Sequence, residues 1–242
     1  MLSNSEIARY SRQILLLGKN SQIKLKNSRA LVLGAGGIGS ALLPYLVSSG
    51  IGYIRLVDPD VVEESNLSRQ ILYNAEHIGA LKGAVAAEYL TSLNPQTEVD
   101  WISGRFSNEN YNSYVDSMDI ILEGTDDIQC KFLVSDISIK KNIPAIIGSI
   151  GNVQGHVFPI AAKTGHACYR CLFEAPPVNE VIPTCATEGI LSPLPGIIGS
   201  MMAYLAVDLL SGNNFLKKIY LMEKGGWRTI SLSQNPHCKC CL

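Results

Sequence analysis

The sequence predicts an α/β fold: a Rossmann-like, mixed and mainly parallel sheet with helices on both faces. Short apolar runs alternate along the chain with segments of helical periodicity, the pattern of repeated strand, helix and strand units. A glycine-rich turn joins the first apolar run to the helix after it. Hydrophobic residues make up 47% of the chain and charged residues 17%, enough apolar side chains to bury a sheet on both faces.

Length and charge narrow the classes of protein. A chain of 242 residues suits one α/β domain with one large core. The formal net charge of −1 provides no field that attracts nucleic acid or an anionic membrane, so we expect neither as a partner. The N-terminus lacks the basic start and apolar run of a secretory signal, which predicts a cytoplasmic location. The most apolar segment, residues 194–210, is interrupted by prolines, glycines and an aspartate, and we interpret it as a buried helix.

The chain is predicted to begin with one helix over residues 3–18. Ser3 and Glu6 have the spacing of a capping box, apolar residues follow at helical spacing up to Leu17, and Gly18 ends the pattern. A strand over Ala30–Leu33 comes next. It starts the sheet.

A strand, helix and strand unit follows directly. The glycine turn leads into a helix over Ala41–Ser49, and a second strand over Tyr53–Val57 ends at Asp58. After a polar loop the alternation continues, with a last, antiparallel strand. Helices are predicted over Leu81–Leu93, Asp127–Lys141 and Pro195–Ser211, and strands over Glu98–Ile102, Asp119–Leu122, Ala145–Ile147 and Val153–Ile160.

The glycine turn has the pattern of a nucleotide-binding loop. Its glycines let the backbone approach a phosphate, and the N–H groups of the helix after it point toward that phosphate. Asp58, at the end of the second strand, is placed to accept hydrogen bonds from ribose hydroxyls. A glycine turn selected only for tight packing is the alternative. The glycines are Gly34, Gly36, Gly37 and Gly39.

Basic and amide side chains after Asp58 favour a triphosphate over a dinucleotide. Asn66, Arg69, Gln70 and Lys82 provide two cations and two amides within a short stretch, more than the two phosphates of a dinucleotide need. Each basic residue taken alone is typical of a solvated surface charge. The group together predicts an ATP site.

The chain resembles the ThiF/MoeB/HesA family of ubiquitin-activating-like adenylyltransferases from end to end, on many motifs in the same order. These motifs are Arg9-Tyr10-Ser11-Arg12-Gln13-Ile14, the Gly34–Gly39 loop, Asp58, Asn66-Leu67-Ser68-Arg69-Gln70, Lys82, Thr125-Asp126, Cys168-x-x-Cys171 and a terminal Cys-x-x-Cys. The resemblance implies ATP-dependent adenylation of the C-terminal glycine carboxylate of a small ubiquitin-like carrier protein that ends in Gly-Gly, with release of pyrophosphate. It also implies a ubiquitin-activating-enzyme-like fold.

The resemblance assigns roles to individual residues. The glycine loop, Arg69 and Lys82 would hold the phosphates, and Arg12 would reach the site from a second subunit, which implies a homodimer. Asp126 would bind Mg²⁺, as suits a hard carboxylate at the carboxyl edge of the sheet. The alternative for this acidic pair is an N-cap for the helix that starts near Asp127.

Two cysteine pairs predict a structural zinc site. The spacing of each pair suits Zn²⁺, and four thiolates would leave no open position for water. Cys168 and Cys171 form one pair. Cys238, Cys240 and Cys241, with His237, leave the second pair open, and the family resemblance favours Cys238 and Cys241.

Cys185 lies outside the pairs, and two interpretations stay open: a thiol that bonds to the carrier during sulfur transfer, or a loop thiol without chemistry. Cys130, on a helical apolar pattern, is expected in the core. His77 and His156 receive no role.

The resemblance divides a single adenylyltransferase domain into an N-terminal helix (1–18), a nucleotide-binding core (29–160) and a zinc and carrier-binding part (161–242). The carrier tail is expected near residues 176–189. The end of the chain at Leu242 predicts that no rhodanese domain follows, so that any sulfur donor is a separate protein. Cys168-Tyr169-Arg170-Cys171-Leu172 favours a ThiS-like carrier over a MoaD-like one. The rival functions are adenylation of a peptide, a nicotinamide-dependent oxidoreductase and a non-catalytic zinc-stabilised adaptor.

Overall fold

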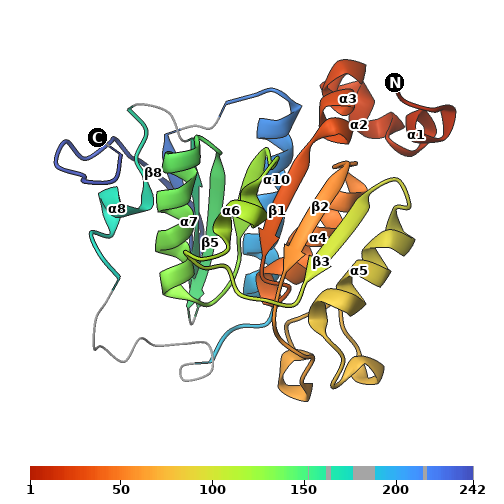
Figure 1. Ribbon diagram of the computed structural model, residues 1–242, viewed down its shortest axis with the longest axis horizontal. Coiled ribbons are helices and arrows are strands. Elements are labelled where there is room, and N and C mark those ends of the chain that lie inside the picture. The colour runs from red at the N-terminus through yellow and green to blue at the C-terminus, as the bar shows by residue number, and fades with distance from the viewer. Residues whose placement is uncertain (152, 162–164, 177–188, 215–216, 242) are drawn as a thin grey trace.

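The computed structural model describes residues 1–151, 153–161, 165–176, 189–214 and 217–241. In these residues an eight-stranded sheet runs through the centre of the molecule in the order β3-β2-β1-β4-β5-β6-β7-β8 (Figure 1). Neighbouring strands from β3 to β5 are parallel, and those from β5 to β8 are antiparallel. The prediction of a mixed, mainly parallel sheet is therefore confirmed. The strands are β1 (Arg29–Leu33), β2 (Tyr53–Val57), β3 (Glu98–Ile102), β4 (Ile120–Glu123), β5 (Ala145–Gly151), β6 (Gln154–Ile160), β7 (Lys218–Glu223) and β8 (Gly226–Ser231).

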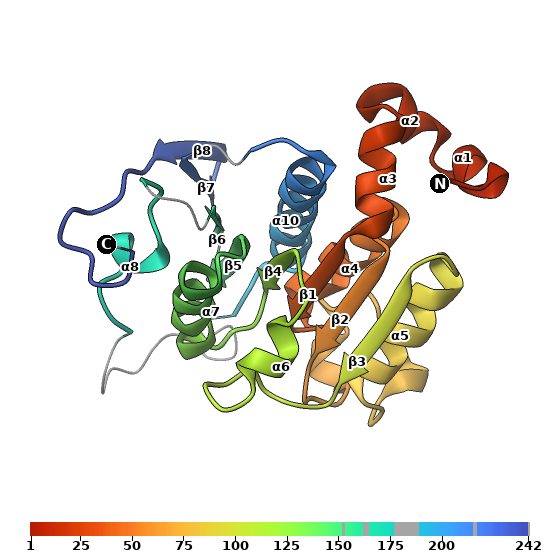
Figure 2. The same cartoon turned by 45° about the horizontal axis from the view of Figure 1, so that its top comes forward.

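Helices cover both faces of the sheet, as predicted (Figures 1 and 2). One face carries α4 (Gly37–Ser48), α5 (Lys82–Leu93) and α10 (Pro193–Ser211), and their apolar side chains form one core cluster with the sheet. The other face carries α6 (Tyr111–Val115) and α7 (Ile128–Lys141), which pack in a second cluster. Because both faces are buried, β1, β2 and β4 are nearly continuous apolar runs.

The register of the central strands positions the site. Leu33 at the end of β1 is paired with Val57 of β2 on one side and with Glu123 of β4 on the other. The carboxyl ends of these parallel strands therefore lie level, and the segments that leave them meet at one edge of the sheet.

The N-terminal region differs from the prediction of a single helix. It forms α1 (Asn4–Arg9) and α2 (Ser11–Leu17), and Tyr10 interrupts the helix between them with φ −94° and ψ 12°. Tyr10 is buried, and its hydroxyl accepts a hydrogen bond of 2.8 Å from Asn94 Nδ2, so the core holds the break in place. The capping box at Ser3 is present. A further helix, α3 (Lys19–Asn27), follows Gly18 and was not predicted.

Helix α10 is the described helix that is long and apolar enough, by length and composition, to cross a membrane. Half of its most apolar window is buried inside the protein, and its side chains belong to the core cluster with α4 and the sheet. The prediction of a buried helix is confirmed. Gly199 makes this packing close, because a β-carbon at that position would lie 2.3 Å from the carbonyl oxygen of Ile38 on α4.

Two glycines of α10 give a matched test of this contact. We expect Gly199→Ala to destabilise the protein by about 1–3 kcal/mol, because the added methyl group overpacks the interface with α4. Gly196→Ala is the control, since no described atom of the same chain lies within 4 Å of a β-carbon at that position. It should stabilise the helix by up to about 1 kcal/mol through helix propensity. Equal effects in chemical denaturation would contradict the close packing of α4 and α10.

Candidate active site

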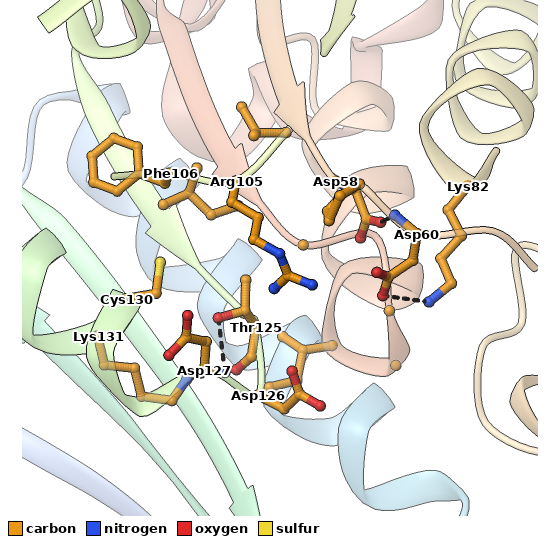
Figure 3. Close-up of a pocket in the computed structure, with 18 of the residues that line it drawn as sticks. Asp58, Asp60, Lys82, Arg105, Phe106, Thr125, Asp126, Asp127, Cys130 and Lys131 are labelled. Carbon is orange, nitrogen blue, oxygen red and sulfur yellow. Dashed lines mark hydrogen bonds and ion pairs between the residues drawn. The ribbon is translucent and has the colours of Figure 1, made fainter. Parts of the chain in front are cut away.

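A pocket lies at the carboxyl edge of the parallel strands (Figure 3). Its walls are the glycine loop after β1, the segments that follow β2, β3 and β4, the first turn of α7 and the end of β5. Most residues predicted from the sequence to bind nucleotide meet here. Those that line the pocket are Gly34, Gly36, Gly37, Asp58, Arg69, Gln70, Lys82 and Asp126.

The glycine loop presents the N-terminus of α4 to this pocket. Gly34 has φ +94°, a conformation that favours glycine, and Gly36 is the N-cap of α4 without a side chain to occupy the first free N–H groups. Such a helix start is suited to an anion. Gly39 does not line the pocket. A β-carbon on it would lie 2.2 Å from the carbonyl oxygen of Gly34, so this glycine lets the helix pack on its own loop.

Asp58 is buried at the end of β2 and holds the glycine loop. Its Oδ2 accepts a hydrogen bond of 2.7 Å from the Ala35 amide, and its Oδ1 accepts one of 2.9 Å from the Asp60 amide. Burial raises the pKa of this carboxyl group, and the two amides and the charge of Lys82 oppose that rise. Each oxygen keeps a second acceptor position, which two ribose hydroxyls can use.

Lys82 lies at the start of α5 and is buried, so its interpretation as a solvated surface charge is wrong. Its ammonium group pairs with Asp60 at 3.2 Å. Arg69 also lines the pocket, and its guanidinium donates 2.9 Å to the carbonyl oxygen of Ser65. Two cations therefore lie beside the glycine loop.

Asn66 and Gln70 have different surroundings. Asn66 does not line the pocket. Its Oδ1 accepts from the Glu63 amide at 3.2 Å, and its carbonyl oxygen accepts from the amides of Arg69 and Gln70, so it shapes the turn that presents these two residues. Gln70 is buried, and its Oε1 has no hydrogen-bond partner among the described residues. An unpaired buried acceptor at a pocket wall is suited to a donor group of a ligand.

The two acidic residues after β4 have different surroundings, which correspond to the two roles considered for them. Asp127 is the N-cap of α7, and its Oδ1 accepts 2.8 Å from the Gln129 amide. Asp126 and Asp127 both line the pocket, but the Asp126 carboxylate has no hydrogen bond or ion pair within the described ranges of the chain. A hard, unpaired carboxylate beside a predicted phosphate site fits Mg²⁺.

Sequence reasoning missed several charged residues of the pocket. Asp60, Arg105 and Lys131 line it, and the side chain of Arg105 extends toward its centre (Figure 3). The Arg105 guanidinium has no ion pair or hydrogen bond to another described residue. The available signal was position alone, because Arg105 follows β3, whose end lies beside Asp58.

Four cysteine sulfurs form a second cluster, remote in sequence from the pocket. The Sγ atoms of Cys168, Cys171, Cys238 and Cys241 all lie within 4.8 Å of one another. Neighbouring pairs are separated by 3.5 to 3.8 Å. Sulfur atoms at the corners of a tetrahedral zinc site lie about 3.8 Å apart, given a Zn–S distance of about 2.3 Å. The four thiols therefore fit a structural zinc ion.

The other candidates are placed less well. Cys240 also hydrogen-bonds Cys168, but it donates to Asp136 Oδ1 at 3.2 Å and is not one of the four residues whose sulfurs all lie within 4.8 Å of one another, and His237 is exposed. Helix α8 (Tyr169–Leu172) carries part of the first pair, and it lies beside the C-terminal segment in both views (Figures 1 and 2). The cluster thus places the end of the described chain against its middle.

Like Gly39 and Asn66, Arg12 does not line the pocket. Arg12 is exposed on α2, which packs at the opposite edge of the sheet, where Gln13 donates 2.9 Å to the carbonyl oxygen of Ser49. Cys185, with most of the predicted carrier-tail region, lies outside the described residues. Cys130 is buried in the core, as predicted, and also borders the pocket.

Comparison with known proteins agrees with this geometry. The model of the ThiF family matches residues 10–241. The chain is 34% identical to the "Sulfur carrier protein adenylyltransferase" of Thermus thermophilus, over 99% of this chain and 92% of that protein. It is 35% identical to the "Adenylyltransferase and sulfurtransferase UBA4" of Saccharomyces cerevisiae, over 99% of this chain and 57% of that protein. The chain therefore spans little more than half of that longer relative.

Solved structures share the fold. Escherichia coli MccB with ATP superposes with a TM-score of 0.84 at 23% identity, over 99% of this chain and 75% of that one. PaaA gives a TM-score of 0.81 at 22% identity, over 97% of this chain and 76% of that one. The family match and the identity to the Thermus protein go further than this likeness of fold. The chain belongs to the ThiF family and is an enzyme of the nucleotidyltransferase class.

Proposed function

We propose that this enzyme adenylates the C-terminal glycine carboxylate of a small ubiquitin-like sulfur-carrier protein with ATP and releases pyrophosphate. One observation carries the proposal: the glycine loop, Asp58, Arg69, Lys82 and Asp126 meet in one pocket at the sheet edge. The chain's similarity to a relative named as a sulfur carrier protein adenylyltransferase supports the choice of acceptor.

The pocket offers a complementary group for each part of ATP. Asp58 would accept from the ribose, and the start of α4, Arg69 and Lys82 would surround the phosphates. Asp126 would hold Mg²⁺, which would neutralise charge on the triphosphate when bound. A terminal carboxylate is already ionised at neutral pH, with a pKa of about 3.3–3.7, so the reaction needs no general base. Positioning and charge neutralisation would then supply the catalysis.

The rival functions have less support. A peptide acceptor is the alternative within the same reaction, and the likeness to MccB, which shows the fold alone, does not choose between the two acceptors. Membership of the ThiF family and the cations around the glycine loop favour adenylation over a nicotinamide-dependent oxidoreductase or an adaptor. A ThiS-like and a MoaD-like carrier are both candidates.

ATP–pyrophosphate exchange with a panel of Gly-Gly-ending carriers tests the proposed reaction. We expect Mg²⁺-dependent exchange with one carrier and a loss of roughly 100-fold or more in Asp126→Ala, because charge on the phosphates would lose its metal clamp. Asp127→Asn is the matched control. Asparagine preserves the N-cap of α7, so this variant should keep most of the exchange.

Either of two results would overturn this proposal. If the protein bound ATP but showed no exchange with any carrier, a peptide would replace the carrier as the proposed acceptor. Equal losses in the Asp126 and Asp127 variants would show that the acidic pair acts through the helix start and not through a metal.

A homodimer with shared sites is the second part of the proposal. Exposed apolar side chains lie around a groove along α4 and α10, and this groove shares Gly37 and Arg69 with the nucleotide pocket. A second subunit bound there would cover these side chains and bring its Arg12 toward the phosphates, which the chain's own Arg12 does not approach. The exposed side chains are Tyr45, Ile71, Tyr89 and Trp227.

Mixing two inactive variants tests the shared site. Coexpressed Arg12→Ala and Asp126→Ala chains should form mixed dimers in which one of the two sites has both residues intact. With random assembly of symmetric dimers, activity should recover to roughly a quarter of the wild-type value. Two affinity tags would demonstrate that mixed dimers have formed. If these dimers showed no recovery of activity, Arg12 would not act in the site of the partner subunit.

The zinc site is the third part of the proposal. We expect Cys238→Ser to lose bound zinc and to lower the thermal midpoint by roughly 10 °C or more, since each kcal/mol corresponds to about 2–4 °C in a domain of this size. Cys240→Ser should keep both, because Cys240 is not among the four mutually close sulfurs and its thiol donates to Asp136. Metal analysis and thermal denaturation measure the two effects. Loss of zinc in Cys240→Ser would contradict this set of four ligands.

A further inference from the structure

A buried ion pair lies at the wall of the pocket. Glu123 ends β4 and Lys131 lies on α7, and the ammonium nitrogen is 2.6 Å from Glu123 Oε2. The two side chains are 0% and 4% exposed. Neither residue belongs to the groups proposed above to contact ATP or metal.

Lys131 uses all its donors on the protein. Its ammonium group donates to Glu123 Oε2, to the carbonyl oxygen of Thr125 at 2.7 Å and to that of Gly148 at 2.8 Å. An ammonium group has three N–H donors, so this arrangement leaves none for a phosphate. Lys131 lines the pocket without being free to bind ligand.

The ion pair forms hydrogen bonds with Thr125, the residue immediately before Asp126. Glu123 Oε1 accepts 2.8 Å from the Thr125 amide and also accepts from its hydroxyl, while Lys131 holds its carbonyl oxygen. The backbone of Thr125 is thus fixed at both its amide and its carbonyl group. Asp126 itself makes no hydrogen bond or ion pair to another described residue that would fix it.

Through Thr125 and Gly148, the ion pair is also connected to two other walls of the pocket. The glycine loop packs on Thr125, since a β-carbon on Gly34 would lie 3.1 Å from Thr125 Cγ2. Gly148, the third acceptor of Lys131, precedes Ser149 and Ile150, which line the pocket. The end of β4, the glycine loop and the end of β5 are therefore connected through one buried pair.

We propose that Glu123 and Lys131 are positioning residues that hold the Thr125–Asp126 turn in the geometry that binds Mg²⁺ beside the nucleotide. This inference rests on the proposed function, because it assigns the pair to the metal side of that site. Neither side chain is a catalytic residue, since each acts through Thr125.

The energetic cost of the pair argues against a role in packing alone. Burial raises the pKa of Glu123, and the charge of Lys131 opposes that rise. Burial therefore disfavours the ionised carboxylate, and Lys131 stabilises it. A buried ion pair is often no more stabilising than apolar side chains of similar volume. The pair provides directional bonds to Thr125 and Gly148 that apolar side chains cannot make.

The test uses the full chain and the double variant Glu123→Gln with Lys131→Met, which removes both charges together and leaves no uncompensated buried charge. Isothermal titration with ATP, with and without Mg²⁺, measures the metal's contribution to binding. We expect the double variant to fold and to bind metal-free ATP nearly as the wild type does. Its apparent Mg²⁺ affinity should fall by about 10-fold or more, as for other residues that orient a metal ligand.

Hydrogen–deuterium exchange provides a readout without metal or turnover. The peptide that covers residues 124–127 should exchange faster in the double variant than in Ser138→Ala, the control, which loses a 2.7 Å hydrogen bond at the far end of α7. The single variant Lys131→Arg keeps the positive charge beside Glu123. It should therefore show slow exchange at 124–127 and part of the Mg²⁺ response.

The outcomes separate this inference from the proposed function. A folded double variant with wild-type Mg²⁺ response and wild-type exchange at 124–127 would overturn the positioning role. If the wild type binds ATP without any Mg²⁺ response, the proposed metal site fails and the inferred role at the metal fails with it. Faster exchange at 124–127 would then still show that the pair holds the turn.

Discussion

The level register of β1 with β2 and β4 is the constraint on which the rest of the structure depends. Leu33 is paired with both Val57 and Glu123, so three strands end together and their next residues face one pocket. A shift of one residue in either pairing would exchange the two faces of a strand, so that each side chain would have to pack against the opposite layer of helices. The apolar faces of the sheet thus fix the polar edge, and the site is a consequence of core packing.

Buried charge at this edge is kept only where backbone groups or an opposite charge compensate for lost water. Asp58 is held by two amides, Lys82 by Asp60, and Glu123 by Lys131. Asp126 and Arg105 differ, because both are exposed to water and neither has a partner for its charged group among the described residues. The pocket therefore consists of charges that the fold has already satisfied and charges that a ligand would satisfy.

The sequence predicted the parts of the fold that depend on local patterns. The strand, glycine loop and helix, with Asp58 after the second strand, follow from short-range periodicity, and the cysteine pairs follow from spacing. The hairpin of β7 and β8 was missed although Gly225 and Gly226 mark its turn, because β8 is exposed and lacks an apolar pattern. The pairing of Glu123 with Lys131 was beyond such patterns, since it forms only when α7 packs on the sheet.

The division of the site has a consequence for specificity. The proposed nucleotide pocket is built on strand ends, where backbone geometry leaves little freedom, and solved structures at 22–23% identity keep the same fold. The acceptor must reach this edge from outside the parallel strands. Apart from Gly37 and Arg69, which also line the pocket, the residues of the exposed groove along α4 and α10 lie outside that strand edge, as do those of the cysteine cluster. Changes there can alter the proposed acceptor or partner without disturbing the register that forms the pocket.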